Sequence, residues 1–427
     1  MHAAAMLAVS AAVGALSGAS EACTSRSDLR AQAAAFVRDG FAVLPAFEAP
    51  DGCGAMRDEM AAMVDAWWRE QLAKPDGGDD AVFTTGTNQT RAQARSRYFF
   101  DSSDRVHFFR EAGATGDASA PPALNKVGHG LHLDESTAFG RYARSARVAH
   151  VARHVAGLVA PVLPQSMYIF KAARLGGAVT AHQDGTFLYT RPRQTVVGLW
   201  LALHDANESN GCLWARPGSH HEPLRRRFVR SAGADEADGV VMTFVNTSAA
   251  RGARVDAEAF LSPSLLGRAR PAADAPAADA PTRPWAAKLL RPLRLLWRRA
   301  RTAAGETALA SARWKGARRS EQAWEWDGVW PQTDGVADSA EDAAAAALDL
   351  SRRTAATLRA RGFVPLNVRA GDLVVIAGTL DHLSLPNGSP HERHSFQLHM
   401  IEGPAEGVSW APENWLQLPP GAEFLRL

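Results

Sequence analysis

The chain has 427 residues, of which 46% are apolar, and its formal net charge at pH 7 is +2. These totals are typical of a globular protein with one large domain or two to three ordinary ones, so a sizeable core is expected. Because the net charge is close to zero, the chain as a whole does not attract polyanions, and we expect no nucleic-acid partner.

The three cysteines, Cys23, Cys53 and Cys212, form no CxxC pair. Their odd number and their spacing exclude a disulfide framework and a zinc ribbon. A reducing compartment is the simplest inference. Cys212 lies between a turn and a strand-like segment, and we expect it to be a small core residue.

Residues 1–26 form an Ala-rich leader that is apolar for about its first twenty residues. This stretch resembles the apolar region of a signal peptide, but no Lys or Arg precedes it. Two interpretations stay open, a poorly ordered leader and a cleaved targeting sequence. We expect a cytoplasmic protein, with organellar or secretory targeting by residues 1–22 as the alternative.

The part of the chain before residue 163 contains three helical patterns and one hairpin pattern. Helices are predicted over residues 27–39, 51–71 and 131–161. The first opens with a Ser-Asp cap and ends at an Asp-Gly pair, and the strand-like FAVLP follows it. Residues 95–111 alternate aromatic and polar residues around a Ser-Ser-Asp turn, which predicts a hairpin.

From residue 163 the apolar period changes from helical spacing to two, which is the spacing of strands. Short strands separated by Gly, Pro, Asn and Asp are predicted in SMYIFKAA, TAHQDGTFLYT, TVVGLWLALHD and CLWARPGSH. The pattern stops near residue 225 and resumes over 362–382 and 393–402. Several strands at this spacing predict a mainly β domain, a sandwich or barrel, with flanking helices.

An insertion interrupts this β domain. Residues 263–345 are rich in Ala, Arg, Pro and Asp, and PAADAPAADAPTRP is a low-complexity repeat, so partial disorder is expected. The domain therefore has two parts, 27–262 and 346–427. Within the insertion, residues 285–301 interleave Leu and Trp with Lys and Arg. Two interpretations of this segment stay open. It is either a basic helix in weak contact with a membrane surface or partner, or a solvated basic loop.

A histidine and an aspartate stand two apart in the predicted strand TAHQDGTFLYT. In a strand, residues at this spacing project from the same face, so His182 and Asp184 point the same way, with Thr186 beside them, and Phe187 points the other way. One imidazole and one carboxylate are two ligands of the set that suits non-haem Fe(II), whose third ligand is a histidine from elsewhere in the chain. An HxD pair alone is weak, because a surface His–Asp pair has the same spacing.

A second segment agrees with this hypothesis. His382 directly follows an apolar strand, and Arg393 stands at the start of the next strand. A buried arginine beside a metal site is costly unless it meets an anion, and a guanidinium binds a carboxylate through two parallel hydrogen bonds. The distal carboxylate of 2-oxoglutarate, whose keto-acid end would chelate iron, is the anion that we expect.

The chain resembles the phytanoyl-CoA dioxygenase family of Fe(II)/2-oxoglutarate oxygenases. The resemblance covers roughly residues 27–225 and 362–427, and it rests on SMYIFK, AHQDGTFLYT, NGCLWARPGSH, GDLVVIAGTLDH and WAPENWLQ. It implies a double-stranded β-helix, a jelly roll with helices on one side. It also implies Fe(II) as cofactor, with 2-oxoglutarate and O2 as co-substrates.

The resemblance also implies roles for single residues. The iron ligands would be His182, Asp184 and His382. The residues that bind 2-oxoglutarate would be Arg393, Ser384, Trp200 and Lys126. The stretch between Asp184 and His382 is about twice the usual length, and the insertion accounts for the excess. Related halogenases replace the carboxylate ligand with a small residue, so Asp184 favours hydroxylation.

Two other histidines, His129 and His132, could in principle form a second metal pair, but no third ligand matches them. We expect them to line the pocket or a surface. The sequence thus predicts a dioxygenase that hydroxylates a small organic or lipid-like molecule and releases succinate and CO2. The alternative is a non-catalytic scaffold that binds a membrane or partner through its basic insertion. The sequence does not identify the substrate or the oligomeric state.

Overall fold

A computed structural model describes residues 26–74, 81–83, 96–114, 116–117, 119–230, 242–247 and 354–427, all of which belong to one compact unit. Residues 1–25, and with them nearly all of the predicted leader, lie outside the described residues. The predicted insertion 263–345 and its basic segment 285–301 lie outside them too. Among the described residues, no helix combines the length and the apolar character that a membrane span requires.

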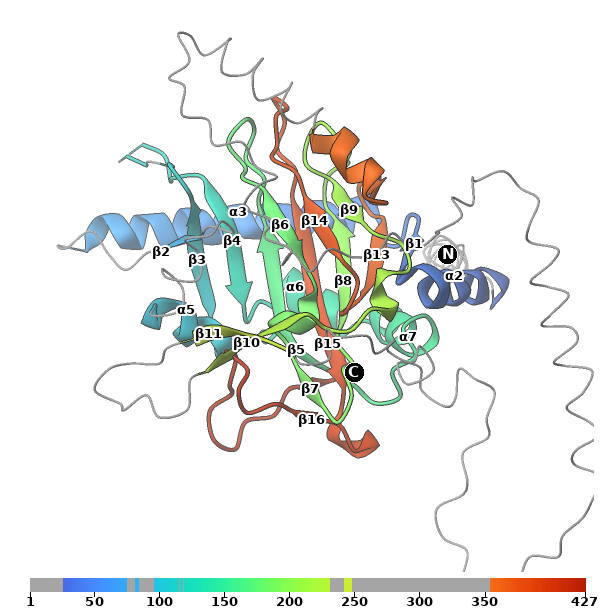
Figure 1. Ribbon diagram of the computed structural model, residues 1–427. Helices are drawn as coiled ribbons and strands as arrows, with labels where there is room; N and C mark the ends of the chain where they lie inside the picture. The colour runs from blue at the N-terminus through green and yellow to red at the C-terminus, as the bar shows by residue number, and fades with distance from the viewer. Residues whose placement is uncertain are drawn as a thin grey trace, which may run out of the picture. The chain divides into compact units, whose positions relative to one another are not determined.

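The described strands build one large sheet in the order β1-β13-β8-β15-β5-β4-β3-β2, with β17 also paired to β5 (Figure 1). Their bounds are β1 Phe41–Leu44, β2 Ala81–Phe83, β3 Val106–Glu111, β4 Leu124–His129, β5 Pro161–Ile169, β8 Val197–Ala202, β13 Leu373–Ala377, β15 Ser395–Glu402 and β17 Leu425–Arg426. Neighbours are antiparallel except β2 and β3, which run parallel.

A smaller antiparallel sheet has the order β12-β9-β14-β6. Its strands are β6 Val179–His182, β9 Leu213–Ala215, β12 Val364–Leu366 and β14 His382–Ser384. Two further pairs join β10 Arg226–Arg230 to β11 Met242–Asn246, and β7 Thr190–Arg191 to β16 Ser409–Trp410. Two antiparallel sheets with long crossovers form a double-stranded β-helix, so the predicted mainly β fold with flanking helices is confirmed.

Helices cover one face of the large sheet. They are α2 Arg26–Asp39, α3 Pro50–Ala73, α6 Ala138–Ala143 and α7 Ala146–His154, and the long α3 crosses behind the strands in Figure 1. The Phe139 ring of α6 lies 5.9 Å from Tyr168 on β5 and 5.0 Å from Phe396 on β15. All three rings are fully buried, so this face of the sheet carries the main hydrophobic core.

The opposite face of the large sheet is the inside of the jelly roll, and strand register determines which side chains it carries. Directly opposed residues of an antiparallel pair share a face. His399 on β15 opposes Gly198 on β8 and Gln165 on β5. Two residues along, Gln397 opposes Trp200 and Met167. A buried inner face with this many polar groups is typical of a site rather than a core.

Ser395, two residues beyond Gln397, continues this inner face toward the open end. It opposes Ile169 on β5, and Ile169 in turn opposes Lys126 on β4. Lys126 therefore lies on the same inner face as Ser395 and His399, two strands away from Ser395.

The predicted hairpin over residues 95–111 is wrong. The segment begins with the helix α5 Arg97–Asp101 and a turn of 3-10 helix, η1 Ser102–Asp104, and only β3 is a strand. Ser96 caps α5, because its hydroxyl accepts a hydrogen bond from the Phe99 backbone N–H at 3.2 Å. Phe99 on α5 and Phe109 on β3 pack against each other. The aromatic residues of this segment therefore recur because a helix and a strand share one cluster, not because two strands form a hairpin.

The predicted helix over residues 131–161 is partly wrong. Two short helices, α6 and α7, occupy its middle, each capped by a hydroxyl, and β5 begins at Pro161. Thr137 and Ser145 are these caps, and each accepts a hydrogen bond from a backbone N–H three residues on. The predicted strand over residues 180–190 is also shorter than expected. It ends at His182, and Asp184 opens the 3-10 turn η2 Asp184–Thr186.

Candidate metal centre

The side chains of His182, Asp184 and His382 meet between the two sheets. One nitrogen from each imidazole and one carboxylate oxygen lie within 4.8 Å of one another. The Asp184 Oδ1 atom lies 3.4 Å from His182 Nε2 and 3.6 Å from His382 Nε2. Asp184 and His382 are buried and His182 is partly buried. The set of two imidazoles and one carboxylate is that of a non-haem Fe(II) site.

Backbone carbonyls determine the tautomer of both imidazoles. His182 Nδ1 lies 2.8 Å from the Thr180 carbonyl oxygen, and His382 Nδ1 lies 3.1 Å from that of Leu380. A carbonyl only accepts hydrogen bonds, so each Nδ1 carries the proton and donates it. Each Nε2 is then unprotonated and faces Asp184, which is the state in which an imidazole binds a metal.

The electrostatics of the centre favour the same protonation states. Burial, with a smaller contribution from His182, outweighs the opposing effect of Asp184 and lowers the pKa of His382 to about 4, so His382 is neutral at physiological pH. Burial alone would raise the pKa of Asp184, but His382, His399 and His182 together outweigh it and leave that pKa well below its ordinary value. A neutral imidazole and an ionised carboxylate are the forms that bind a metal ion.

Hydrogen bonds join the segment around Asp184 to the segment before His382. Gln183 donates from its side-chain nitrogen to the Thr379 carbonyl at 2.8 Å, and Gly185 donates from its backbone to the Gly378 carbonyl at 2.7 Å. The register between β6 and β14 places His382 directly opposite His182. Two segments that are far apart in sequence therefore bring their ligands to one point.

The expected strand alternation holds only as far as Asp184. Gln183 is extended, with φ −115° and ψ 126°, so His182 and Asp184 do share a side. Beyond Asp184 the turn η2 replaces the strand, and the prediction that Phe187 points away from the site is wrong. The Phe187 ring lies 6.0 Å from the His182 ring, because the 3-10 turn folds it back.

A third histidine, His399, lies against the other oxygen of the carboxylate. Its Nε2 is 3.4 Å from Asp184 Oδ2, and its Nδ1 accepts a hydrogen bond from the Gln165 side-chain nitrogen at 3.1 Å. Nε2 is therefore the protonated nitrogen and points at Oδ2. A Cβ atom at Gly198 would lie 3.2 Å from the same oxygen, so glycine leaves room for the carboxylate there. Sequence reasoning missed His399, whose one signal is its even spacing of six residues from Arg393, which places both side chains on one face of an extended segment.

Arg393 is almost completely buried on the inner side of the jelly roll. Its guanidinium donates to the Ser395 hydroxyl and to the Gly211 carbonyl, each at 3.0 Å, and its Nε has no partner among the residues that the structure describes. Burial lowers its pKa to about 10, and among the described residues no carboxylate forms an ion pair with it. A buried guanidinium with an unused N–H is a ready site for an anion.

Two other residues predicted to bind 2-oxoglutarate lie close to Arg393. The Trp200 ring centroid is 5.3 Å from the guanidinium carbon. Ser384 is buried on β14 and opposes Leu213, two residues after the Gly211 carbonyl that Arg393 binds. The fourth predicted residue, Lys126, lies further along the inner face, and its amino group is 3.2 Å from His129 Nε2.

The two additional histidines are both buried and do not form a metal pair. His129 contacts Lys126, whereas His132 Nδ1 lies 2.9 Å from the Ser166 hydroxyl. Of the two expected positions, a surface position is wrong, since both side chains are buried. Cys212 is fully buried, as expected of a core residue, and burial raises the pKa of its thiol to about 12.

Aromatic side chains lie between the ligands and the outer strands. Phe187 packs against Phe228 on β10 at 5.9 Å and against Phe244 on β11 at 6.1 Å. These rings belong to the same cluster as Phe99, Phe109 and Trp415. The wall beside His182 is therefore apolar.

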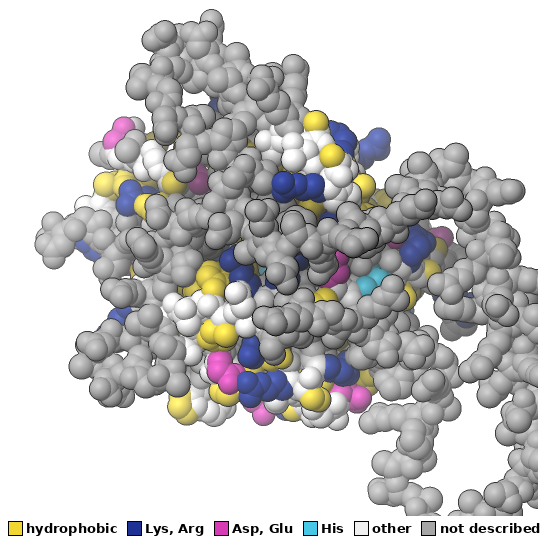
Figure 2. Space-filling model, viewed as in Figure 1, with side chains coloured by type: hydrophobic (Ala, Val, Ile, Leu, Met, Phe, Trp, Pro, Cys, Tyr) yellow, Lys and Arg dark blue, Asp and Glu magenta, His cyan; other side chains and the backbone are white. Residues whose placement is uncertain are grey.

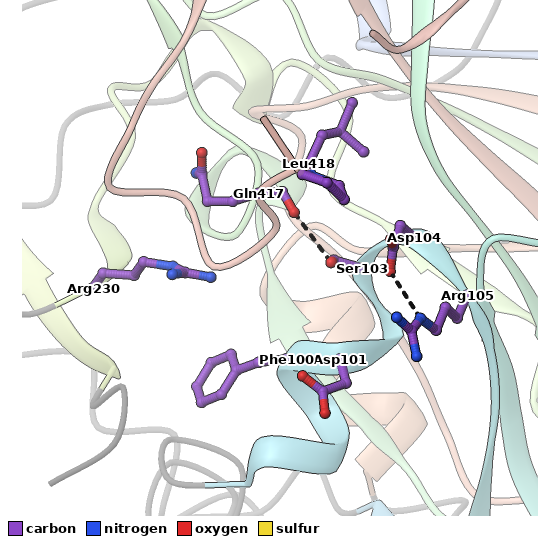
Figure 3. A pocket seen from close by; sticks show the side chains of 9 residues that line it. Phe100, Asp101, Ser103, Asp104, Arg105, Arg230, Gln417 and Leu418 are labelled. Carbon is purple, nitrogen blue, oxygen red and sulfur yellow. Dashed lines mark hydrogen bonds and ion pairs between the residues drawn. The ribbon is translucent and has the colours of Figure 1, made fainter. Parts of the chain in front are cut away.

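A separate pocket of about 330 Å³ lies near this cluster, and none of the predicted site residues lines it (Figure 3). Arg230 enters it from β10, and Asp101, Asp104 and Arg105 come from α5 and the turn after it. Asp104 pairs with Arg105 at 3.5 Å, and the Ser103 hydroxyl donates to the Gln417 carbonyl at 3.1 Å. The other charged groups bind residues outside the lining, since Asp101 pairs with Arg97 at 3.7 Å and Arg230 donates to the Trp415 carbonyl at 2.8 Å.

The sequence model of the phytanoyl-CoA dioxygenase (PhyH) family matches residues 36–259. Phytanoyl-CoA dioxygenase domain-containing protein 1 of Mus musculus is 30% identical over 408 residues, which cover 94% of this chain and 98% of that protein. Phytanoyl-CoA dioxygenase 1 of Oryza sativa subsp. japonica is 31% identical over 392 residues, which cover 90% of this chain and 93% of that protein.

The His-Asp-His cluster inside a jelly roll defines a class, the Fe(II)- and 2-oxoglutarate-dependent oxygenases, which use O2 as co-substrate. Within that class, the chain belongs to the phytanoyl-CoA dioxygenase family. It is an enzyme with a small-molecule substrate, and the predicted cofactor and co-substrates are those of the family.

Proposed function

We propose that this oxygenase hydroxylates a C–H bond of a small, largely apolar organic or lipid-like molecule. The iron ligands in this proposal are His182, Asp184 and His382. The observation that carries it is the convergence of three metal-binding atoms within 4.8 Å, each in the protonation state that a metal requires. Asp184 fills the ligand position that related halogenases leave to a halide, which favours hydroxylation.

The bound iron would supply the oxidising chemistry, in which one oxygen atom of O2 enters the substrate and the other enters succinate as CO2 leaves 2-oxoglutarate. The protein holds the reactants in place. Arg393 and Ser384 would bind the distal carboxylate of 2-oxoglutarate, with Trp200 beside it and Lys126 as a further contact. Arg393 has an unused buried N–H and no carboxylate partner among the described residues, which supports this role.

The substrate class follows from the surroundings of His182. The partly buried rings of Phe187 and Phe244 and the buried ring of Phe228 offer an apolar wall, and the Arg226 guanidinium stacks on the Phe244 ring at 4.2 Å. Such a wall binds hydrocarbon or aromatic surface and excludes water from the reacting atoms. On the face shown in Figure 2, acidic, basic and apolar side chains of the described residues are interspersed along the lower edge, so this edge has no field of one sign.

The direct test measures succinate formation by purified protein with Fe(II), 2-oxoglutarate and O2, first without substrate and then with a library of small apolar compounds. Mass spectrometry would detect products that gain one oxygen atom. We expect iron-dependent succinate formation that a matching substrate accelerates. Iron-independent or absent turnover with every compound would contradict the proposal and favour the non-catalytic alternative.

A further inference from the structure

A chain of four polar groups runs from the inner face of the jelly roll into the aromatic cluster. Lys126 Nζ lies 3.2 Å from His129 Nε2, and His129 Nδ1 lies 2.8 Å from the Ser102 hydroxyl. That hydroxyl donates to the Phe99 carbonyl at 2.6 Å. Lys126, His129 and Ser102 are all buried, and water does not compete for these bonds.

The hydrogen bonds that link these four groups all run in one direction, from Lys126 to the Phe99 carbonyl. The Phe99 carbonyl accepts, so the Ser102 hydroxyl uses its single proton there and its oxygen accepts from His129 Nδ1–H. His129 Nε2 is then unprotonated and accepts from the amino group of Lys126. Burial, with a smaller contribution from Lys126, holds the pKa of His129 well below its ordinary value, which keeps the imidazole neutral. His129 therefore directs one N–H of Lys126 and leaves the others free to bind a ligand.

The ring of His129 is itself held in place. It lies 4.8 Å from the Trp415 ring, 5.7 Å from Phe99 and 6.0 Å from Phe109. The amino group of Lys126 also lies 3.7 Å from the centre of the Phe83 ring. In the part of the chain that the structure describes, no carboxylate pairs with Lys126. Burial without such a partner lowers the pKa of Lys126 well below its ordinary value, and an anion bound beside the amino group would favour its charged form.

We propose that His129 is a positioning residue that holds the amino group of Lys126 where it meets a carboxylate of 2-oxoglutarate. This inference rests on the proposed function, in which Lys126 contacts the co-substrate. His129 does not touch the co-substrate itself and acts only through Lys126. Its removal should weaken co-substrate binding and leave the iron ligands, which lie on other strands, unaffected.

The test is a double-mutant cycle on the affinity for 2-oxoglutarate, measured by calorimetry without oxygen on Fe(II)-loaded protein. His129→Phe keeps a planar ring among the aromatic neighbours but removes both nitrogens. We expect it to weaken 2-oxoglutarate binding roughly 10-fold, as the loss of a hydrogen bond to a charged group does. Lys126→Met should weaken binding by at least as much, and adding His129→Phe to it should change nothing further.

Two variants separate positioning from general packing. His129→Gln offers an amide oxygen to Lys126 near the position of Nε2, and it should recover a measurable part of the lost affinity. His132→Phe is the matched control, because His132 is equally buried and also bonded to a serine hydroxyl, but does not contact Lys126. It should leave 2-oxoglutarate affinity unchanged. Iron affinity should stay at the wild-type value in all of these variants.

Three results would overturn the inference. They are wild-type affinity in His129→Phe, wild-type affinity in Lys126→Met, and a His129→Phe effect that is as large in the Lys126→Met background as alone. Each of these leaves the proposed oxygenase activity intact if the wild-type protein binds 2-oxoglutarate, although wild-type affinity in Lys126→Met would also remove Lys126 from the proposed contacts of the co-substrate. A wild-type protein that binds iron but no 2-oxoglutarate would refute the proposed function and this inference together.

Discussion

At the scale of single residues, the metal centre depends on three side chains that no other described group replaces. Asp184 supplies the only carboxylate of the cluster, and His182 lies beside it on the same strand end. We expect His182→Ala and Asp184→Ala each to abolish Fe(II) binding and turnover while the fold survives, because neither side chain belongs to the main hydrophobic core. Iron titration and circular dichroism test this. Ordinary iron affinity in either variant would show that the ligands are assigned wrongly.

His399 should affect the same centre more mildly. It donates to the Asp184 oxygen that does not face the other two histidines, so it fixes the orientation of the carboxylate. Loss of such a partner behind a metal ligand typically lowers metal affinity about 10- to 100-fold. We expect this loss in His399→Phe, measured by iron titration. A smaller loss is expected in Gln165→Leu, which removes only the partner of His399. Unchanged iron affinity in His399→Phe would contradict this role.

Arg393 controls the co-substrate rather than the metal. Removing one partner of a buried charge pair typically costs about 2–5 kcal/mol, which corresponds to a roughly 30- to 4000-fold loss of affinity. We expect Arg393→Ala to lose 2-oxoglutarate affinity by a factor in this range while iron binding survives. Arg393→Lys should not rescue it, because a single ammonium cannot reproduce the planar fork. A 2-oxoglutarate titration of both variants tests this prediction. An unchanged affinity for 2-oxoglutarate in Arg393→Ala would mean that its carboxylate binds elsewhere.

These residues differ in how far the sequence could predict them. His182 and Asp184 stand two apart, and with His382 and Arg393 they lie in motifs that resemble a family. His399 lies near the site because β15 carries it on the inner face of the sheet, and His129 is linked to the site through its contact with Lys126. The partner of His399 is Asp184, which comes from a turn far away in the sequence. The contact of His129 with Lys126 depends on the direction of the two side chains. The sequence alone predicts neither contact.

At the scale of elements, continuous apolar runs predicted the buried strands correctly, whereas the alternating pattern of 95–111 did not predict its local structure. β8 and β13 are buried along their whole length and rich in branched residues, so pattern and packing agree. The aromatic residues of 95–111 alternate for another reason, because α5 and β3 contribute rings to one cluster. Helix capping by Ser96 decided the local structure there.

An ion-pair network connects the ends of β9 and β14 next to a metal ligand. Asp381, whose side chain is 4% exposed, pairs with both Arg216 and Arg225, and Arg216 also pairs with Glu222 at 2.7 Å. We expect Asp381→Asn to lower the free energy of unfolding by about 2–3 kcal/mol, because two guanidinium groups lose a buried partner. Urea unfolding measures this.

The same network has a defined pH dependence and a matched control. Burial raises the pKa of Asp381, but Arg225 and Arg216 outweigh it and leave the pKa below its ordinary value. The stabilisation is therefore complete at neutral pH and is lost as the pH falls below about 4. Glu222→Gln removes only the more exposed partner of Arg216, and we expect a change below about 1 kcal/mol. Equal effects of the two variants would contradict the importance of Asp381.

At the scale of the whole molecule, the sequence predicts that the domain is mainly β but not the order of its strands. β15 lies between β5 and β8, and β13 lies between β8 and β1, although the chain between β8 and β13 includes the predicted insertion. Pairing between distant strands depends on shape and side-chain complementarity over the whole sheet, which local periodicity does not contain. The jelly roll was predictable chiefly through the resemblance to a family.

The position of the predicted insertion relative to the site residues indicates whether it contributes to catalysis. Every residue proposed to bind iron or 2-oxoglutarate lies in 124–230 or 364–402, outside the deleted residues 263–340. The strands on either side, from β11 and from β12 onward, complete their sheets with partners among the described residues. We therefore expect deletion of residues 263–340 to leave iron-dependent 2-oxoglutarate turnover close to that of the full chain.

The deletion should be compared with the full chain in thermal unfolding and in succinate formation without added substrate, since both tests are independent of the unknown substrate. Similar values in both assays would mean that the insertion serves a role other than catalysis, such as the surface contact that is one of the two interpretations of 285–301. A folded deletion variant that binds iron but has lost turnover would mean instead that this segment closes over the site and excludes water during the reaction. An unfolded product would show that the two parts of the β domain need the segment to assemble, and the prediction would be wrong.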